Sequence, residues 1–374
     1  MADLSVDLLG YKLKTPFVLG SGPLSFSGEA MVRAMEHGFG AVVTKTIRLQ
    51  PAVNPVPHIW QVNATTLINA EKWADDPPEQ WVTEYIPQAR ERGAIVIASI
   101  GHTVEEAEAL VEPVTRAGAH ILELVSYQHE AMVAMVRLAR RKTRLPILAK
   151  ISPNSADPVG MAIACLDAGA DGITAIDSLG PTLRIDINTG RPVLGSVRGQ
   201  GWTSGAAIKP LAVRIVADIA HQRRGPIVGT GGVMKGEDAV EMLMAGATAV
   251  GVCSAPIALG MKHVPKMLKQ LNESLDRLGF TSAAAVSGHA LRFINETEDH
   301  GLLEFAFKDA TCTNCQKCVD MCPYEARHLT RPQMDLDRDL CVDCGFCVAV
   351  CPTDALLARH GEAQYGKQIV ARTR

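Results

Sequence analysis

The sequence predicts an α/β protein: a (β/α)8 barrel followed by a small cysteine-rich α+β domain. Three observations carry this prediction. Eight short apolar runs alternate with helical patterns through residue 260. No dinucleotide-binding fingerprint follows the first run, where the sequence reads G-S-G-P-L-S. Two copies of one four-cysteine pattern lie between Cys312 and Pro352.

The eight apolar runs are rich in β-branched residues and mostly continuous, as expected for parallel strands that are covered on both faces. Eight strand–helix units in about 260 residues are the pattern of a (β/α)8 barrel. The predicted strands are Phe17–Gly20, Ala41–Thr46, Ile95–Ile100, Ile121–Val125, Ile147–Ile151, Gly172–Ile176, Ile227–Thr230 and Ala249–Cys253.

Between the strands, apolar residues recur at i, i+3 and i+4, which indicates helices such as Ala131–Arg141, Pro158–Ala168 and Ala239–Ala245. A doubly wound open sheet is the alternative, but it would place G-x-G-x-x-G after a strand, and no strand here is followed by one. Several helices end at a glycine, a C-cap signal, and these glycines are Gly38, Gly118, Gly169 and Gly246.

We expect the barrel domain to comprise residues 1–301 and the second domain residues 302–374. From Met261 to Gly301 the pattern is mostly helical and amphipathic, and it closes the barrel. The tail after Arg359 is polar and is expected to be loosely packed or to cover a neighbour.

Each cysteine run reads C-x-x-C-x-x-C-x-x-x-C-P, and the runs begin at Cys312 and Cys341, 29 residues apart. A 4Fe–4S cube needs four thiolates, and in two-cluster ferredoxins the last cysteine of each run serves the other cluster. The predicted ligands are Cys312, Cys315, Cys318 and Cys351 for one cluster, and Cys341, Cys344, Cys347 and Cys322 for the second.

Zinc and disulfides are the alternatives for these cysteines. Zinc sites use one or two C-x-x-C pairs with longer gaps, and disulfides need an oxidising compartment, of which the chain shows no sign. Cys165 and Cys253 lie in apolar patterns and are expected to be reduced core thiols. Residues 307–358 resemble a bacterial-type ferredoxin domain, which implies transfer of single electrons.

The chain has 374 residues, 47% of them hydrophobic, enough for one large domain and a small one. Its net charge of −3 gives no electrostatic reason to expect nucleic acid or a membrane surface as a partner. The first residues lack the pattern of a signal peptide, and no apolar run reaches the length of a transmembrane helix. A cytoplasmic location is expected, where the low potential also protects the clusters.

Catalytic groups of such barrels lie at the C-terminal ends of the strands. The last two strands are followed by Gly231-Gly232 and Cys253-Ser254, where barrels often bind phosphate through backbone N–H groups. A long loop after the sixth strand adds Ser204-Gly205. Ordinary tight turns are the alternative interpretation of each glycine pair.

Two lysines, Lys45 and Lys150, lie within apolar strands at the barrel mouth. A buried charge is costly without a partner, so the pair predicts an anionic ligand, although a salt bridge at the rim explains either one alone. Reduced flavin carries negative charge near N1, and a lysine beside that atom stabilises it. Together with the phosphate site and the clusters, the lysines predict bound FMN.

The motifs A-K-I-S-P-N, G-A-D-G-I-T-A, S-G-A-A-I-K-P, G-T-G-G-V and V-C-S-A resemble those of the dihydroorotate dehydrogenase superfamily, as do L-I-N-A-E (67–71) and I-V-I-A-S-I-G (95–101). The resemblance covers essentially the whole chain and is greatest to the FMN- and ferredoxin-containing part of dihydropyrimidine dehydrogenase. It implies that Lys150 lies by flavin N1 and that Asn69 and Asn154 face the substrate. The residues implied to hold FMN are Gly22, Lys45, Asn69, Lys150, Ser204, Gly205, Gly231, Gly232, Cys253 and Ser254.

The chain departs from that family after its fourth strand. The family carries an Asn-x-Ser-Cys-Pro type motif there, and a long loop with the Cys or Ser that moves the substrate proton. Here Val125 replaces the Asn, and no such loop precedes Ala131. The Asn-Thr pair expected after the sixth strand is Asp177-Ser178. The acid/base residue of the family is therefore missing, and two pyrimidine contacts are changed.

Candidate replacements follow three strands: His102 the third, Tyr127 and His129 the fourth, and Asp177 and Ser178 the sixth. Hydride transfer to or from flavin N5 needs a partner proton, which Tyr or His can supply. A rim residue with an ordinary hydrogen bond is the alternative for each. An ionised Asp177 can only accept hydrogen bonds, so with Ser178 it predicts contact with an N–H-rich or cationic substrate.

No nicotinamide-binding motif is visible, so electrons are expected to pass between the clusters and a partner. The resemblance implies an FAD- and NAD(P)-binding subunit or a free ferredoxin, in a homo- or hetero-oligomer. The favoured interpretation is an oxidoreductase acting on a CH–CH or C=C bond of a small molecule, in a pyrimidine-like ring. Two alternatives stay open: a reductase of a non-pyrimidine substrate, and an electron-transfer subunit whose barrel does no substrate chemistry.

Overall fold

The computed structural model describes residues 1–222 and 225–366. The chain divides into two compact units, Met1–Ile294 and Asn295–Arg374. Among the described residues, no helix is both long and apolar enough to cross a membrane.

Eight parallel strands of the first unit close into a barrel, in the order β10-β15-β16-β3-β4-β7-β8-β9. Each is one of the eight predicted strands, with ends that differ by a few residues at most, so the barrel is confirmed over the open sheet. The strands are β3 (Phe17–Leu19), β4 (Ala41–Val43), β7 (Val96–Gly101), β8 (Ile121–Val125), β9 (Ile147–Ile151), β10 (Gly172–Ala175), β15 (Ile227–Thr230) and β16 (Ala249–Val252).

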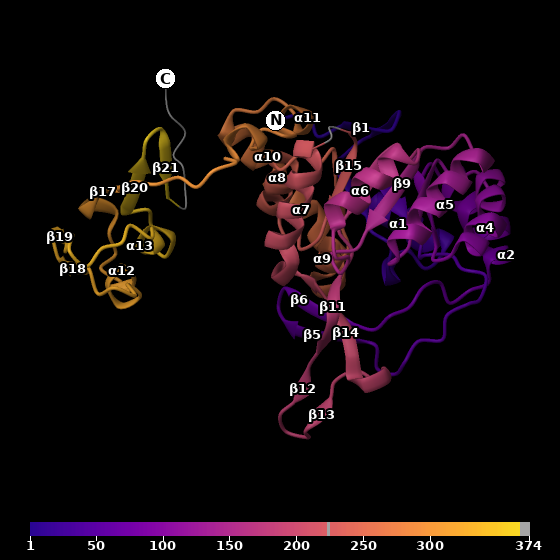
Figure 1. Cartoon of the computed structure of the whole chain (residues 1–374), viewed down its shortest axis with the longest axis horizontal. Helices are drawn as coiled ribbons and strands as arrows, with labels where there is room; N and C mark the ends of the chain where they lie inside the picture. Colours follow the sequence, from indigo (N-terminus) through magenta and orange to yellow (C-terminus); the bar gives the residue numbers. More distant parts are fainter. Residues whose placement is uncertain (223–224, 367–374) are drawn as a thin grey trace. The chain divides into compact units, whose positions relative to one another are not determined.

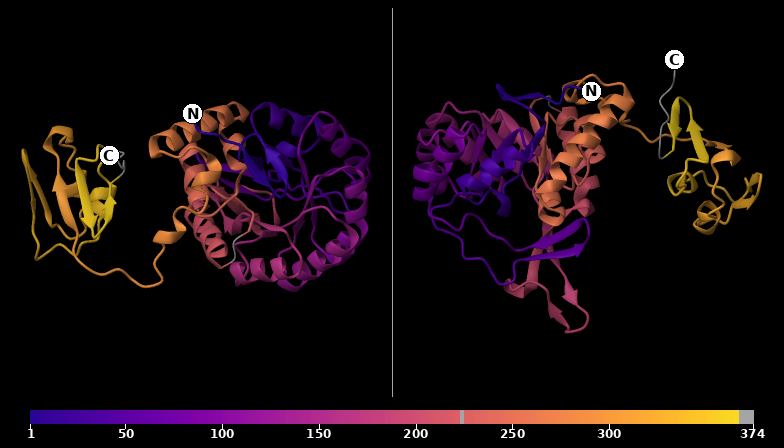
Figure 2. Two further views of the ribbon diagram at one scale, coloured as in Figure 1. Left: turned by 90° about the horizontal axis from the view of Figure 1, so that it is seen from above. Right: turned by 180° about the vertical axis from the view of Figure 1, so that it is seen from behind.

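Helices form a ring outside these strands, as Figure 2 shows from above. Four of them, α1, α4, α6 and α8, are followed by the predicted C-cap glycines, whose φ values of 104°, 92°, 112° and 113° lie where only glycine avoids a steric cost. The helices are α1 (Gly28–Glu36), α2 (Pro78–Gln80), α3 (Ile86–Glu91), α4 (Val104–Arg116), α5 (His129–Lys142), α6 (Pro158–Asp167), α7 (Lys209–Gln222), α8 (Gly236–Met244), α9 (Ser254–Leu259), α10 (Val264–Leu278) and α11 (Ala283–Val286).

The core of this unit lies between the barrel strands and the helix ring. Strand residues such as Phe17, Ile97, Ile121 and Leu122 are fully buried. Removing each such side chain from water contributes roughly 1.5–3 kcal/mol, so the barrel is a rigid platform for groups at its strand ends. The predicted helical stretch from Met261 extends as far as the 3-10 helix Leu291–Phe293, and β1 (Val6–Leu8) pairs with β2 (Tyr11–Leu13) before the barrel begins.

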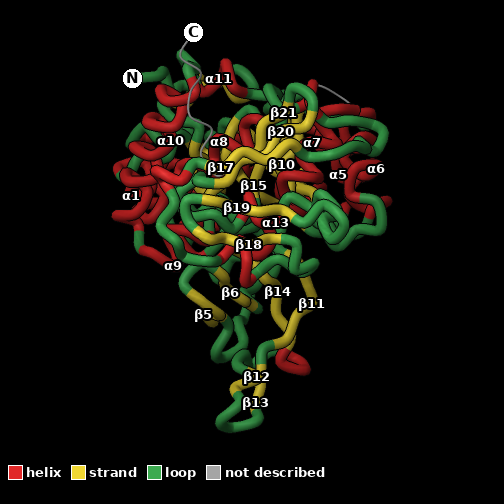
Figure 3. Tube along the Cα trace, turned by 90° about the vertical axis from the view of Figure 1, so that its left-hand side faces the viewer, coloured by secondary structure: helices red, strands yellow, loops and turns green. Residues whose placement is uncertain are grey.

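An antiparallel sheet of four strands, in the order β11-β14-β6-β5, lies beside the barrel (Figures 1 and 3). The expectation of a long loop after the sixth barrel strand is therefore wrong. The segment L-G-P-T-L has no alternation, so no local signal marks it as a strand. It pairs with β14, and β14 pairs in turn with β6, as in the pair Trp202 and Asn69, which are distant in the chain. The strands are β5 (Ile59–Asn63), β6 (Thr66–Asn69), β11 (Leu179–Leu183) and β14 (Gln200–Gly205), with the hairpin β12 (Ile185–Asp186) and β13 (Arg191–Pro192) beyond them.

The second unit has a small core that includes Cys347, Val348, Cys351 and Leu356. The tail expected to be loosely packed forms a turn and the strand β21, which ends at Tyr365, and residues 367–374 lie outside the described part of the chain. The elements are β17 (Glu304–Phe307), α12 (Lys317–Asp320), β18 (Arg327–Thr330), β19 (Gln333–Leu336), α13 (Phe346–Ala349), β20 (Leu356–His360) and β21 (Ala363–Tyr365).

Candidate functional site

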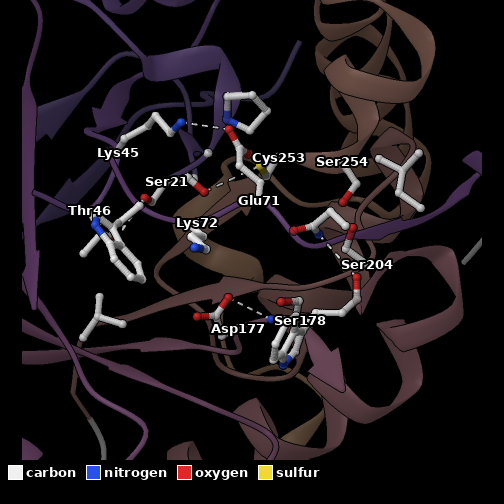
Figure 4. A pocket seen from close by; sticks show the side chains of 18 of the residues that line it. Ser21, Lys45, Thr46, Glu71, Lys72, Asp177, Ser178, Ser204, Cys253 and Ser254 are labelled. Carbon is white, nitrogen blue, oxygen red and sulfur yellow. Dashed lines mark hydrogen bonds and ion pairs between the residues drawn. The ribbon is translucent and has the colours of Figure 1, made fainter. Parts of the chain in front are cut away.

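A cavity of about 860 Å³ opens where the barrel strands end, a volume within the range of cofactor and substrate sites. Residues at the ends of all eight barrel strands line it, together with residues of the inner strands β6 and β14 of the antiparallel sheet. Figure 4 shows part of this wall. The sequence-predicted residues in its wall are Gly22, Lys45, Asn69, His102, Tyr127, Lys150, Asp177, Ser178, Ser204, Gly205, Gly231, Gly232, Cys253 and Ser254.

Two predicted residues lie outside this wall. His129 is exposed at the start of α5. Asn154 is also exposed, and its side chain joins two loops. Its amide donates to Ser152 Oγ (3.0 Å) and to the Ser178 carbonyl (3.1 Å), while its oxygen accepts from the Gly180 N–H (2.9 Å). Asn154 thus shapes the segment that follows β10.

Glycines form one side of the cavity. Gly205, Gly231 and Gly232 have φ values of 84°, 123° and 78°, which other residues rarely adopt. A Cβ on Gly232 would lie 2.6 Å from Lys209 Cβ, so no side chain fits there. Backbone N–H groups can therefore approach a ligand closely, and β15 and β16 are paired neighbours, so the loops after them are adjacent. This arrangement suits the phosphate end of FMN.

Lys150 and Asp177 meet on the cavity floor, because β9 and β10 are neighbours and Asp177 lies two positions after the end of β10. The Lys150 Nζ lies 3.4 Å from Asp177 Oδ1, and the side chains are 12% and 21% exposed. Burial opposes the charged ammonium, but the carboxylates of Asp177 and Glu123 outweigh it and raise the pKa of Lys150. Lys150 is therefore a fixed cation at the base of the site.

Glu123 also lines the cavity, and the sequence analysis missed it. Its side chain is 1% exposed; Oε2 accepts from Thr174 Oγ1 at 2.9 Å, and Oε1 has no hydrogen-bond partner within the described part of the chain. Burial raises the pKa of Glu123, while the nearby Lys150 ammonium acts in the opposite direction. A charged residue inside the apolar strand Ile121–Val125 is the same signal that singled out the two lysines.

Lys45 is only 3% exposed, and its charge is already paired (Figure 4). Its Nζ lies 2.9 Å from Glu71 Oε1 and 2.9 Å from Asp75 Oδ2. Burial lowers the pKa of Lys45, but these two hydrogen-bonded carboxylates outweigh it, so the net shift is upward. Lys45 thus forms the salt bridges that were the alternative to an anionic ligand. A contact between Lys45 and FMN stays a prediction.

The wall opposite the glycines is aromatic. The rings of His102 and Tyr127 are tilted together with their centroids 4.9 Å apart, and Arg48 stacks on Trp73 with its Cζ 4.1 Å from the ring centre. Burial, assisted by Arg48, lowers the pKa of His102 to about 4, so its imidazole is neutral. Asp177, followed by burial, raises the pKa of Tyr127. Arg48 and Trp73 follow no motif, which is why the sequence did not reveal them.

Cys253 touches the glycine side of the cavity. Its thiol lies 3.8 Å from the Ser21 carbonyl, and burial raises its pKa to about 12. The group is therefore a neutral thiol and not a nucleophilic thiolate.

In the second unit, Cys312, Cys315, Cys318 and Cys351 line one small cavity, which is the first predicted ligand set. Burial raises the pKa of Cys351, but hydrogen bonds from the backbone of Thr353, Leu356 and Ala355 outweigh it and lower the pKa, as suits a bound thiolate.

Of the second predicted set, Cys347 lies in α13, near Cys344 and beside the Arg327 guanidinium. Among the described residues, no three His, Cys, Asp or Glu side chains converge as they would on one metal ion. A 4Fe–4S cube does not require this, because each of its thiolates binds a different iron. The cysteine residues present fit such a cube.

The chain combines a barrel, whose cavity has a glycine-lined side and a cationic floor, with a domain that contains two runs of four cysteines. These features define the class of iron–sulfur flavoprotein oxidoreductases. Two family models match the chain: "Dihydroorotate dehydrogenase" over residues 3–275 and "4Fe-4S dicluster domain" over residues 311–355. The chain belongs to the dihydroorotate dehydrogenase family and carries a C-terminal 4Fe–4S ferredoxin-like domain.

Several curated relatives are named dihydroorotate dehydrogenase B (NAD(+)), catalytic subunit. The protein of Geobacter metallireducens is 35% identical over 269 residues, which cover 68% of this chain and 87% of the relative. Those of Anoxybacillus flavithermus and Geobacillus kaustophilus are 31% and 33% identical over 78% and 75% of this chain, and 96% and 93% of their own length.

Proposed function

We propose that the chain is the catalytic subunit of an FMN-dependent oxidoreductase that reduces a C=C bond, or oxidises the corresponding CH–CH bond, in a ring related to the pyrimidines. The observation that carries this proposal is that Lys150, Asp177 and Tyr127 share one cavity with a glycine cradle. The family to which the chain belongs uses FMN for such chemistry, and the ferredoxin-like domain supplies an electron path.

FMN, when bound, supplies hydride transfer and exchange of single electrons. The proposed phosphate contacts are the backbones of Gly205, Gly231, Gly232 and Ser254. Lys150, which stays protonated, places a fixed positive charge on the cavity floor, where it stabilises negative charge that develops nearby.

Tyr127 is the proposed proton donor. Because Asp177 raises its pKa, the phenol holds its proton at neutral pH and can pass it to a substrate carbon. His102, neutral and in contact with the Tyr127 ring, orients that ring. His129 is exposed outside the cavity and takes no part in this proposal. Asp177 accepts from a substrate N–H, and Asn69 and Ser178 are the further proposed substrate contacts.

Electrons are proposed to travel through two 4Fe–4S clusters, held by Cys312, Cys315, Cys318 and Cys351 and by Cys341, Cys344, Cys347 and Cys322. The proposed partner is an FAD- and NAD(P)-binding subunit or a ferredoxin, in a cytoplasmic complex. The relatives are named catalytic subunits of an NAD(+) enzyme, which supports a partner of this kind.

A reductase of a non-pyrimidine substrate is the second candidate. Val125 stands where the resembling enzymes carry an Asn, and Asp177 where they carry an amide. The Arg48–Trp73 stack adds a cationic and aromatic surface to the cavity, which favours a larger planar acceptor or an anionic one.

Anaerobic stopped-flow spectroscopy tests the proposal. The reconstituted protein is reduced with dithionite and mixed with uracil, thymine and a panel of conjugated amides and enoates, while flavin reoxidation is followed. Rapid reoxidation by uracil or thymine is the expected result. A response to another acceptor only would favour the second candidate. Silence across the panel, with normal electron transfer between clusters and flavin, would contradict both and leave an electron-transfer subunit.

A further inference from the structure

Arg327, the first residue of β18, is buried in the second unit with an exposure of 3%. A buried guanidinium normally pairs with a carboxylate, because an isolated charge is costly to remove from water. Among the described residues, Arg327 forms no ion pair with an Asp or Glu, and its Nη2 has no hydrogen-bond partner. Its charge and one of its donors are therefore left to another group.

Two side chains, those of Phe305 and Cys347, lie next to the Arg327 guanidinium and indicate which group could supply the missing charge and acceptor. The Arg327 Cζ lies 4.0 Å from the ring centre of Phe305 in β17, a cation–π contact. The guanidinium also lies beside the thiol of Cys347, which is itself 8% exposed. Arg327 is thus held by an aromatic ring and directed at a predicted cluster ligand.

A cube ligated by four thiolates is an anion, and its sulfurs accept N–H hydrogen bonds. It supplies both things that Arg327 lacks: a counter-charge and an acceptor for Nη2. Among the described residues, the other predicted cluster has no equivalent buried cation, because Arg331, the guanidinium near Cys312, is 42% exposed and is neutralised by Asp309 at 2.6 Å.

We infer that Arg327 is a positioning residue that gives the cluster held by Cys347 a higher reduction potential than its neighbour. Reduction adds one electron, and hence one negative charge, to the cube. A buried cation and an N–H···S hydrogen bond stabilise that reduced form. An electron that enters the unit from the flavin or from the partner therefore resides mainly on the cluster of Cys347. This inference rests on the two clusters of the proposed function.

The test is a potentiometric titration of the full, reconstituted chain under anaerobic conditions, followed by electron paramagnetic resonance. Arg327→Gln removes the charge. We expect one cluster couple to shift to lower potential, so that its ratio of reduced to oxidised form falls at least tenfold at the wild-type midpoint. The second couple should not move. Couples that stay unchanged, or that shift together, overturn the inference.

Arg338→Gln is the matched control. Arg338 faces the same ring, with its Cζ 5.6 Å from the centre of Phe305, but it is 48% exposed and paired with Asp343 at 3.0 Å. Both couples should stay in place in this variant. If Arg338→Gln moves a couple as far as Arg327→Gln, the inference fails, because a surface charge then has the same effect.

If the Arg327→Gln variant loses iron, the titration is made with Arg327→Lys in its place. It keeps the charge and loses the planar set of donors, so a smaller shift in the same direction is expected, and an unchanged potential overturns the inference. The couple affected should be the one that Cys347→Ser perturbs, and a shift of the other couple also overturns it.

Iron and sulfide content separates the two claims. A content of one cube per chain would contradict the two-cluster proposal itself. The Arg327 variants would then be judged on the remaining couple, and an unchanged potential would overturn the inference.

Discussion

The two units of this chain treat a buried cation in opposite ways. In the barrel, Lys150 is 12% exposed and lies 3.4 Å from the Asp177 carboxylate, with Glu123 nearby. In the second unit, Arg327 is 3% exposed, its Nη2 has no hydrogen-bond partner among the described residues, and its neighbour is the thiol of Cys347. One cation is balanced by the protein's own carboxylates, and the other is directed at a cofactor ligand.

The difference indicates how far each unit depends on its cofactor. The barrel has an extensive apolar core and an internal charge balance, so it is expected to fold before FMN binds. The second unit has a core of a few residues, two of which are cysteines, and it leaves a charge uncompensated. Its stability should come largely from the bound iron and sulfide.

Removal of iron is the strongest test of this comparison. Chelation should abolish slow amide exchange in residues 304–360, because metal binding supplies the folding free energy of such small units, and it should leave exchange in the barrel strands unchanged. Hydrogen exchange followed by mass spectrometry measures both at once. Protection that persists in β17 and β20 without iron would contradict the comparison.

Tyr127→Phe should lower substrate turnover by about 10²–10⁴-fold, the usual contribution of a positioned acid or base. Reduction of the flavin through the clusters should be spared, because the phenol acts only on the substrate. Steady-state and single-turnover kinetics separate the two steps. His129→Ala is the control, since that side chain is exposed outside the cavity and turnover should stay within about twofold.

Lys150→Met should destabilise the barrel by about 3–5 kcal/mol, because it leaves the carboxylates of Asp177 and Glu123 buried without their cation. Adding Asp177→Asn should recover part of that loss, since one of the unpaired charges is then absent. Urea unfolding followed by tryptophan fluorescence gives both values. If the destabilisations caused by Lys150→Met and Asp177→Asn simply add in the double variant, the two residues are not coupled.

Asp177→Asn alone should raise KM for the physiological substrate by about tenfold, the effect of losing one hydrogen bond to a charged acceptor. The kcat should change less, because the contact exists before the chemical step. An unchanged KM would remove Asp177 from the substrate site and leave it as the partner of Lys150.

The pH dependence of stability provides the smallest test. The pKa of His102 is about 4 in the folded chain and near 6.5 when unfolded, so between these values the unfolded chain binds the additional proton. Stability should therefore fall as pH drops from 6.5 towards 4, by roughly 1 kcal/mol for this partly exposed ring. Between pH 7 and pH 5, the stability of the His102→Gln variant should fall by about that amount less than the stability of the wild-type chain. Equal losses in both proteins would contradict the low pKa.

The functional residues fall into two groups: those marked by a local sequence signal and those brought together only by long-range contacts. The cysteine spacing and the lysines at strand ends are local features, and they pointed to the two regions where function is expected. Glu123 was within reach of the same reasoning, because it is a charge inside a buried strand. Arg48 and Trp73 were not, since their stacking joins two loops that carry no motif.

The sequence by itself determined the eight barrel strands, because parallel strands buried on both faces require continuous apolar runs. It also determined the C-cap glycines, whose positive φ is a local property. Only the tertiary structure decided that Asn69 pairs with Trp202 in a second sheet, that Lys45 meets Glu71 and Asp75, and that Arg327 meets Cys347. Those contacts join residues distant in the chain, and their geometry depends on packing that no local pattern encodes.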